Sequence, residues 1–558
     1  MPSSITELES ISETIKALLA SGKAADVAKA YNISTQLVEK NKDNDQVLIN
    51  HAYICTAAGQ HVAAIIHATK AYEINNLNTD AYKIIANAYL ECNEPFEAMP
   101  YARRYYEFDK DDTIGLILFA RAREAIGDYY PAAEKLQWIM ENKTLAPDQE
   151  SLCHFHLGRA LSHMDGQSDK AILHLENALS MSPNNPRILS TIANLHAQHN
   201  RSEDAIKVLA RVMEIAPKSG PTHWNIIRNK KVTSEDSEVI ESAKKIYMND
   251  KNDAKDRITA GYALAKILYD LKEYEGAIEC WNSAGALKKN DEGFDITKEK
   301  VVYGEYYSKF PNKATKHNFS KLNSTPIFIC GMPRSGTTLT EQILGAHSEV
   351  TPLGELSYMN MAVERVKGTN LPLKSVEAAQ FIRDTYLKRI AFHHVETPWF
   401  TDKMPLNFRY IPLILNAFPE SKVVYCRRQP QAVCFSNFSN YFPAGGLAFS
   451  CTQEDIAEYY SMHHAYMSYL FQIFSDNIYE NHYELLTENQ VEQTNKLLKN
   501  CDLTFEEACL DFHKSERPIQ TASQKQVKQG MYKGSSEKWR RYEQWLSPML
   551  TTLGRHGL

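Results

Sequence analysis

The sequence predicts a chain in two parts: an all-helical array of repeated helix pairs, followed by an α/β domain with a parallel sheet. Two observations carry this prediction. Small residues recur with a 34-residue period in the first half of the 558-residue chain, and a short apolar run beyond residue 325 leads into a glycine-bounded loop and a helical pattern. A period of this size indicates stacked repeats. A strand, loop and helix in succession is typical of a parallel sheet covered by helices.

The repeat period is clearest in windows that begin at Asp45, Thr79 and Thr113. Their eighth positions are Ala52, Ala86 and Ala120, and their twentieth positions are Ala64, Ala98 and Ala132. Windows at Pro186 and Ile258 keep alanine at both positions, and a less regular unit near Ser151 has Gly158 at the eighth. Two antiparallel helices approach closely only where their facing side chains are small. The pattern resembles the tetratricopeptide repeat; the alternative is an all-α domain with accidental alanine spacing.

The edges of the array are less regular. The first 40 or so residues look helical and are expected to form a divergent capping unit. The stretch Gly220 to Asp253 fits the period poorly and is expected to form an irregular helix pair. The array as a whole is predicted to occupy residues 1–300. A linker over 301–325 and an α/β domain over 326–558 are predicted to follow.

Bulk composition excludes some functions. The net charge of −6 argues against a protein that binds nucleic acid through bulk charge. The ten cysteines form no C-x-x-C pair, and no histidine cluster accompanies them at zinc-ligand spacing. We therefore expect free thiols in a reducing compartment, and hence a cytoplasmic location. We see no secretory signal at the start, and no apolar run long enough to span a membrane.

The α/β domain opens with a candidate anion-binding loop. Pro326 to Cys330 reads as a buried strand, Gly331 to Thr338 as a loop, and Leu339 to Leu344 as the start of a helix. This order aims backbone N–H groups and a helix N-terminus at an anion. The two loop glycines have the spacing of a Walker A loop, but Thr337 stands in place of its lysine. A kinase or ATPase uses that lysine with Mg²⁺, so the substitution argues against this chemistry.

The loop string Pro333-Arg-Ser-Gly-Thr-Thr338 instead resembles the 5′-phosphosulfate loop of sulfotransferases. A second strand candidate, Lys422 to Cys426, leads to Arg428 and, eight residues later, Ser436. These two residues resemble the arginine and serine that hold the 3′-phosphate of the sulfuryl donor in that family. A planar arginine is well suited to such a phosphate.

The region from Pro326 to about Tyr542 is similar to the bacterial tetratricopeptide-repeat sulfotransferases, which are related to the tyrosylprotein sulfotransferases. The likeness places the catalytic glutamate 21 residues after Arg334, at Glu355, and the catalytic lysine at Lys403. It places further donor-site residues at Tyr483, Ser523 and Lys538. One departure is Asn440, where the animal enzymes carry a second arginine.

The resemblance implies an enzyme that transfers a sulfuryl group from 3′-phosphoadenylyl sulfate (PAPS) to an acceptor hydroxyl. Glu355 is the expected base, and Arg334 and Lys403 are expected to stabilise the developing charge. The donor's 5′-phosphate is assigned to Arg334, Ser335, Gly336, Thr337 and Thr338. Its 3′-phosphate is assigned to Arg428 and Ser436. No metal is expected.

The acceptor stays open at this point. The family likeness favours tyrosine in a protein or peptide held by the repeats, while a carbohydrate and a small phenol remain alternatives. Two other functions also remain: a kinase-like protein with a P-loop that binds nucleotide, and a repeat scaffold with a vestigial sulfotransferase domain. Neither a nucleic-acid partner nor a membrane span is expected.

Overall fold

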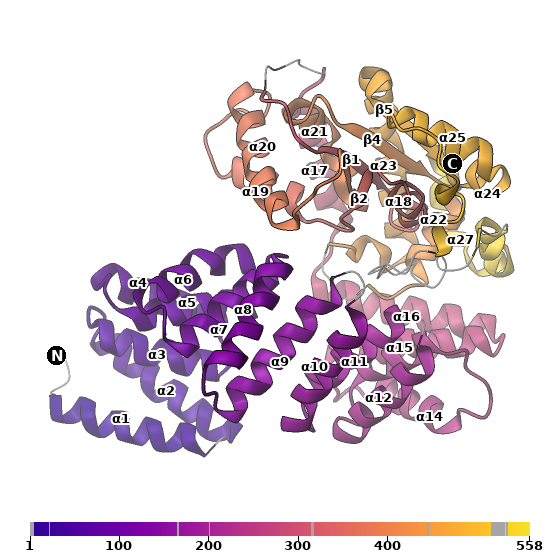
Figure 1. Cartoon of the computed structure of the whole chain (residues 1–558). Coiled ribbons are helices and arrows are strands. Elements are labelled where there is room, and N and C mark those ends of the chain that lie inside the picture. The colour runs from indigo at the N-terminus through magenta and orange to yellow at the C-terminus, as the bar shows by residue number, and fades with distance from the viewer. Residues whose placement is uncertain are drawn as a thin grey trace. The chain divides into compact units, whose positions relative to one another are not determined.

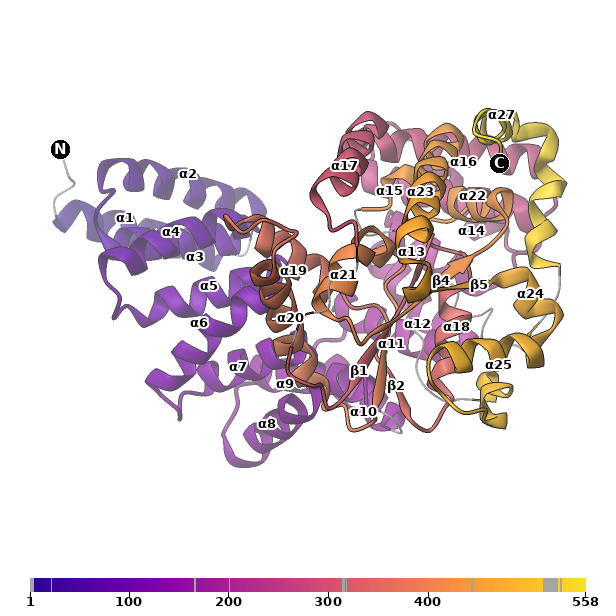
Figure 2. The ribbon, with the colours of Figure 1, turned by 90° about the horizontal axis from the view of Figure 1, so that it is seen from above.

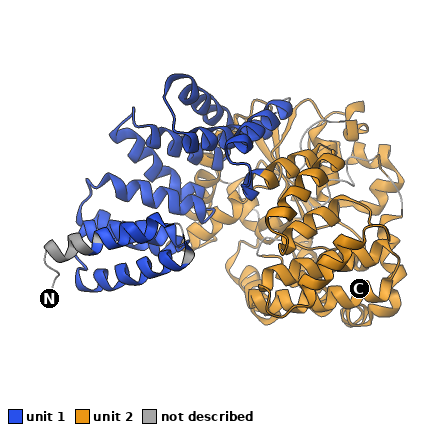
Figure 3. Cartoon of the chain, turned by 90° about the horizontal axis from the view of Figure 1, so that it is seen from below, with its two compact units in different colours: residues 1–188 blue, residues 189–558 orange. Residues whose placement is uncertain are grey.

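The computed structural model describes residues 5–21, 23–164, 167–199, 201–313, 317, 319–442, 446–514, 530–531 and 534–558. The chain forms two compact units, Met1–Ile188 and Leu189–Leu558, which Figure 3 colours separately. The first unit is entirely helical, and the second contains helices and one sheet. The two units are described in turn.

The first unit is a row of antiparallel helix pairs (Figure 1). Its helices are α1 (Ile5–Ala20), α2 (Ala24–Lys40), α3 (Asp45–Ala57), α4 (His61–Ile74), α5 (Thr79–Glu91), α6 (Pro95–Phe108), α7 (Thr113–Ala125), α8 (Tyr129–Asn142), α9 (Pro147–Ser162) and α10 (Ser168–Met181). Helices α3, α5 and α7 begin at the first residues of the three predicted windows. Helices α1 and α2 also confirm the helical prediction for the start of the array, over residues 5–20 and 24–40.

The small residues of the repeat lie where the two helices of a pair meet. All six alanines of the first three windows are fully buried. At Gly158, a Cβ atom would lie 2.7 Å from Leu175 Cγ and 2.9 Å from the carbonyl oxygen of Ala171. That spacing is too short for any side chain, which explains why this unit has glycine where the others have alanine. Close helix contact is therefore the physical basis of the repeat.

Helix α11 (Pro186–Gln198) spans the division between the units, and the second unit continues the helical series. Its next helices are α12 (Ser202–Ile215), α13 (Gly220–Asn229), α14 (Ser237–Met248), α15 (Ala254–Asp270), α16 (Tyr274–Glu292) and α17 (Ile296–Lys309). The short helices α13 and α14 are the irregular pair that the sequence predicts between 220 and 253.

The sheet of the second unit has five parallel strands in the order β2-β3-β1-β4-β5. The strands are β1 (Thr325–Gly331), β2 (Val350–Pro352), β3 (Trp399–Asp402), β4 (Lys422–Arg427) and β5 (Ile478–His482). Both predicted strands, β1 and β4, are confirmed and lie side by side in the centre. The predicted α/β class with a parallel sheet is therefore correct.

Helices cover both faces of this sheet (Figure 2). They are α18 (Thr337–Gly345), α19 (Tyr358–Lys367), α20 (Val376–Ile390), α21 (Ile411–Ala417), α22 (Pro430–Phe438), α23 (Gln453–Phe474), α24 (Tyr483–Glu488), α25 (Gln490–Asn500) and α27 (Ser547–Arg555). On one face, Ile329 packs with Ile343 of α18 and Leu497 of α25. On the other face, the ring of Phe328 lies 5.7 Å from the ring of Tyr386 of α20. Alternate β1 residues thus enter two separate cores, as expected for a central parallel strand.

The last repeat helices share a core with the α/β part of the second unit. Trp281 of α16 is buried, and its ring lies about 6 Å from the rings of Phe435, Phe438 and Tyr542. Lys289 on the same helix forms a 2.6 Å ion pair with Asp455 of α23. By packing, the repeats after Leu189 belong with the sheet. The predicted boundaries at residues 300 and 325 stay a prediction.

All ten cysteines are free thiols. In the described part of the chain, no helix is long and apolar enough to cross a membrane.

Candidate functional site

The candidate site begins at the glycine-bounded loop between β1 and α18, at the carboxyl end of the central strand. Gly331 has φ 147°, and a Cβ there would lie 2.4 Å from the carbonyl oxygen of Cys426. Gly336 has φ 103°, and a Cβ there would lie 2.7 Å from Tyr483 Cδ2. Both positions therefore require glycine. Arg334, between them, also has a positive φ of 71°.

The loop places a buried hydroxyl next to the N-terminus of a helix. The Ser335 side chain is buried, and its Oγ has no hydrogen-bond partner among the described residues. Thr337 and Thr338 follow as the first two residues of α18, where backbone N–H groups lack partners within the helix. An unpartnered buried hydroxyl beside a helix N-terminus fits a phosphate oxygen.

The structure joins this loop to the second predicted anion-binding pair. Arg334 Nε donates to Ser436 Oγ on α22 over 3.0 Å, and the carbonyl oxygen of Arg334 accepts from Arg428 Nη1 over 3.0 Å. Asn440 donates to the carbonyl oxygen of Ser436 over 2.6 Å. Residues that lie about 100 positions apart in the sequence therefore form one cluster, because β1 and β4 are neighbours in the sheet.

Arg428 is held on several sides. Its Nε donates to Ser536 Oγ over 3.1 Å, and its Nη2 donates to Ser535 Oγ over 3.2 Å. The guanidinium lies 4.4 Å from the ring centroid of Tyr483, and the Tyr483 hydroxyl is 2.6 Å from Ser535 Oγ. Sequence reasoning missed both serines. No local motif marks them, and they lie in a 3₁₀ segment, η7 (Ser535–Trp545), over 100 residues downstream.

The predicted base and lysine are in direct contact. Lys403 Nζ donates to Glu355 Oε1 over 2.6 Å. The lysine side chain is fully buried, whereas 41% of the glutamate side chain is exposed. The backbone N–H of Lys403 also donates to the carbonyl oxygen of Gly354 over 2.9 Å. A carboxylate in this position is open to an incoming hydroxyl, and the ammonium behind it is shielded from water.

A second carboxylate, which sequence reasoning missed, supports this pair. Glu341 of α18 is buried, and its Oε1 accepts from the N–H of Gly354 and from Thr401 Oγ1, both over 3.0 Å. Its Oε2 lies 4.0 Å from Lys403 Nζ. Burial raises the pKa of Glu341. Through these two hydrogen bonds, Glu341 connects Thr401 in β3 to Gly354, the residue before Glu355. In the sequence it reads as an ordinary helix residue.

Asp402, next to Lys403, is buried as well. It accepts hydrogen bonds from the Tyr386 hydroxyl over 2.9 Å and from Asn407 Nδ2 over 3.2 Å. Burial raises the pKa of Asp402 to about 8. A carboxyl group that favours its neutral form limits the negative charge behind Lys403.

Lys538 and Ser523 complete the set of predicted donor-site residues. Lys538 is exposed in η7, the segment that carries Ser535 and Ser536. Ser523 lies outside the described residues. Within the described ranges, no group of three or more histidine, cysteine, aspartate or glutamate side chains is placed to hold a metal ion.

The fold and the site define a class: an α/β domain with a glycine-bounded loop at the carboxyl end of its central strand. The family comparison is more specific. Residues 326–507 match the model of the sulfotransferase family, and residues 163–229 match the tetratricopeptide repeat. The chain therefore combines a sulfotransferase-family domain with tetratricopeptide repeats.

Several related proteins are similar in sequence to this chain. An uncharacterized protein of Aquifex aeolicus is 32% identical over 400 residues, which cover 68% of this chain and 52% of that protein. The chain thus spans about half the length of this relative. A putative protein-tyrosine sulfotransferase of Caenorhabditis briggsae is 26% identical over 35% of this chain and 70% of its own length. A protein-tyrosine sulfotransferase of Drosophila melanogaster is 26% identical over 33% of this chain and 39% of its own length.

Among solved structures, the sulfotransferase domain of the Synechococcus PCC 7002 olefin synthase matches with a TM-score of 0.31 and 18% identity. The match covers 41% of this chain and 91% of that one. A tetratricopeptide-repeat protein of Thermus thermophilus matches with a TM-score of 0.29 and 20% identity, over 33% of this chain and 98% of that one.

Proposed function

We propose that this protein is an enzyme that transfers a sulfuryl group from PAPS to an acceptor hydroxyl. The observation that carries the proposal is the hydrogen-bonded cluster of Arg334, Ser436 and Arg428. It sets two cationic side chains, from the loop and from the end of β4, next to each other. PAPS carries phosphate groups at both its 5′ and 3′ positions, and a ligand with two anionic ends needs two such groups.

In this proposal the loop from Arg334 to Thr338 holds the 5′-phosphosulfate, with Ser335 Oγ as one of its hydrogen-bond donors. Arg428 and Ser436 hold the 3′-phosphate. Tyr483 lies against both the loop and Arg428, so its ring lines the same site. Lys538 and Ser523 remain proposed contacts of the nucleotide.

The transfer step follows from the Glu355–Lys403 pair. Glu355 accepts the proton of the acceptor hydroxyl as the oxygen forms a bond to sulfur. The bond from sulfur to the phosphate oxygen breaks, and its electron pair leaves with adenosine 3′,5′-bisphosphate. Lys403 and Arg334 stabilise the negative charge that develops on the transferred and departing oxygens. This scheme uses no metal ion.

We further propose that the acceptor is a tyrosine in a protein. The likeness to relatives described as protein-tyrosine sulfotransferases supports this choice, and a repeat array offers a surface for a protein partner. The cytoplasmic location inferred from the free thiols is part of the same proposal. A carbohydrate or small phenol acceptor is the alternative.

A thermal-shift experiment tests the donor assignment against the kinase and scaffold alternatives. Adenosine 3′,5′-bisphosphate should raise the melting temperature, and ATP with Mg²⁺ should not, because a ligand stabilises the state that binds it. Arg428→Ala should remove the shift. The control is Arg427→Ala, because this neighbouring side chain is 42% exposed and pairs with Glu480 instead. Stabilisation by ATP with Mg²⁺ alone would favour the kinase, and no stabilisation by either would favour a scaffold.

A further inference from the structure

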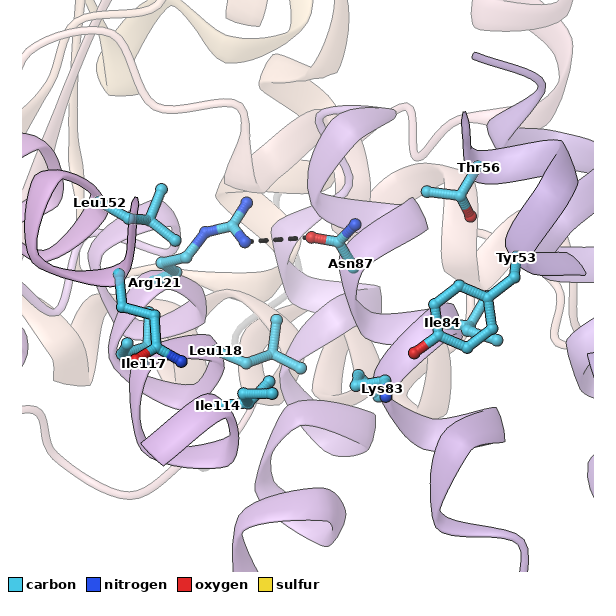
Figure 4. Close-up of a pocket in the computed structure, with 11 residues that line it drawn as sticks. Tyr53, Thr56, Lys83, Ile84, Asn87, Ile114, Ile117, Leu118, Arg121 and Leu152 are labelled. Atoms are coloured by element: carbon cyan, nitrogen blue, oxygen red, sulfur yellow. Dashed lines mark hydrogen bonds between the residues drawn. The ribbon is translucent and has the colours of Figure 1, made fainter. Parts of the chain in front are cut away.

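A pocket of about 290 Å³ in the first unit shows how this chain compensates cationic side chains that are partly withdrawn from water (Figure 4). Lys83 donates to Asp80 over 2.7 Å, and Arg121 donates to Asn87 over 3.0 Å and to Glu91 over 3.3 Å. An ionic group that is buried without a partner is costly. A buried charge that loses its partner during a reaction therefore needs a second one.

The proposed transfer step removes a partner from Lys403. Its ammonium donates to Glu355 Oε1 over 2.6 Å, and the lysine side chain is fully buried. Once Glu355 has taken up the acceptor's proton, its carboxyl group is neutral and no longer balances this charge. A buried ammonium without a counter-ion is strongly disfavoured. Another group must therefore compensate Lys403 at the moment when its charge is needed.

Glu341 lies in the right place to be that group. Among the described residues, the carboxylates of Glu341 and Glu355 are the two within 4.0 Å of Lys403 Nζ. Asp402 is the neighbour of Lys403 in the chain, but burial raises its pKa to about 8, so this carboxyl group is mostly protonated at neutral pH. Glu341 is therefore the anionic neighbour that Lys403 keeps when Glu355 is neutral.

The side chain of Glu341 is held by the two segments that carry the reacting groups. It is buried, and its Oε1 accepts from the N–H of Gly354, which precedes Glu355, and from Thr401 Oγ1, two residues before Lys403. Its Oε2 faces Lys403 Nζ at 4.0 Å. Burial raises the pKa of Glu341, while the charge of Lys403 and the two hydrogen bonds oppose this rise and favour the carboxylate.

We propose that Glu341 is a positioning residue for the transfer step, an assignment that rests on the proposed function. It holds the ammonium of Lys403 and compensates its charge when the acceptor's proton moves to Glu355. Lys403 then turns its hydrogen bond from Glu355 to the oxygen that leaves sulfur, and it gives up no proton. Glu341 acts through Lys403 and takes no part in bond formation or cleavage.

Two substitutions separate the charge of Glu341 from its hydrogen bonds. Glu341→Gln keeps an oxygen that can accept from Gly354 and Thr401 but removes the charge, whereas Glu341→Asp keeps the charge on a shorter side chain. Glu341→Gln should lower kcat for sulfuryl transfer about 10-fold, less than the ~10²–10³-fold that loss of a group in direct contact with the developing charge costs. Glu341→Asp should retain more of the wild-type kcat. The Kd of adenosine 3′,5′-bisphosphate should stay the same in both variants.

Glu506→Gln is the matched control. Glu506 also accepts from a backbone N–H and a hydroxyl, both of Ser348, over 2.9 and 2.6 Å. Its ionic neighbour is His347, at 3.5 Å, and not Lys403. The control therefore makes the same chemical change in a similar set of hydrogen bonds, and it should leave kcat at the wild-type value.

Melting temperatures test whether the effect of Glu341 passes through Lys403. Glu341→Gln should lower the melting temperature of the wild type, because it removes one of the two counter-ions of a buried lysine. In a Lys403→Met protein the same substitution should raise the melting temperature, since a buried carboxylate without its lysine is unfavourable. If Glu341→Gln does not fold by itself, folding of the double variant with Lys403→Met would support the counter-ion role.

A Glu341→Gln enzyme with the wild-type kcat would overturn the proposal. So would a higher kcat in Glu341→Gln than in Glu341→Asp, equal shifts of the melting temperature with and without Lys403, or failure of both Glu341→Gln and the double variant to fold, because each result would leave Glu341 with a structural role alone. If the wild type transfers no sulfuryl group, the proposed function fails instead. The melting temperatures then still decide whether Glu341 compensates Lys403.

Discussion

At the residue scale, the contact between Glu355 and Lys403 leads to the most direct prediction about the proposed mechanism. Glu355→Gln keeps the size of the side chain and one hydrogen bond but removes the base. We expect kcat to fall by about 10²–10⁴-fold, the usual contribution of general-base catalysis. Affinity for adenosine 3′,5′-bisphosphate should change little, because the proposed phosphate contacts lie elsewhere. Steady-state kinetics and a separate nucleotide titration measure the two effects, and a variant with near wild-type kcat would remove Glu355 from the mechanism.

Asp402 gives a prediction about pH. Burial raises its pKa to about 8 from an ordinary value of 3.8, so the folded chain holds a proton that the unfolded chain releases. The stability that goes with this proton is complete below the ordinary pKa and is lost as the pH rises toward 8. We expect Asp402→Asn to gain stability relative to the wild type between pH 5 and 8.

Melting temperatures at several pH values measure this difference. Asp384→Asn, which changes an exposed carboxylate on α20, is the control and should show no such trend. A difference between Asp402→Asn and the wild type that does not vary with pH would contradict the assignment of a neutral Asp402.

Much of the site could be predicted at this scale, because its residues lie in short motifs that end strands. The loop from Arg334 to Thr338 begins three residues after the end of β1, and Arg428 directly follows β4. The partners of these residues could not be predicted. Ser536 binds Arg428 across 108 positions of sequence, and Glu341 supports Glu355 only through the fold. Their hydrogen bonds depend on tertiary packing, which leaves no local pattern.

At the scale of elements, two glycines on helices should respond in opposite ways to alanine. Gly158→Ala places a methyl group 2.7 Å from Leu175 Cγ and should destabilise the first unit by about 1–3 kcal/mol. Gly304→Ala on α17 meets no atom within 4 Å and should stabilise its helix by about 0.5–1 kcal/mol. Calorimetric melting of both variants measures this. A Gly158→Ala protein as stable as the wild type would mean that its helix pair is not tightly packed.

Close packing between helices also explains how much of the repeat array could be predicted from sequence. Helix starts at Asp45, Thr79 and Thr113 coincide with the predicted windows, because close helix contact selects a small residue at fixed positions. The irregular pair α13–α14 does not follow the 34-residue period, so the sequence shows it only as a break in that period.

At the scale of the whole molecule, the repeats after Leu189 and the sheet form one unit. A fragment of residues 186–558 should fold and bind adenosine 3′,5′-bisphosphate. Residues 326–558 alone should not, since removal of α16 exposes the rings that pack on Trp281, including Tyr542. Circular dichroism and nucleotide titration of both fragments measure this. A stable, nucleotide-binding 326–558 fragment would show that the predicted domain boundary is also a folding boundary.

Direct observation of transfer tests the central claim. The full chain is incubated with PAPS and with tyrosine-containing peptides or a small phenol, and the products are identified by mass spectrometry. We predict a sulfonated acceptor hydroxyl and an equal amount of adenosine 3′,5′-bisphosphate, both lost in Arg428→Ala and Glu355→Gln and kept in Arg427→Ala. Intact PAPS with every acceptor, together with phosphoryl transfer from ATP with Mg²⁺, would contradict the account.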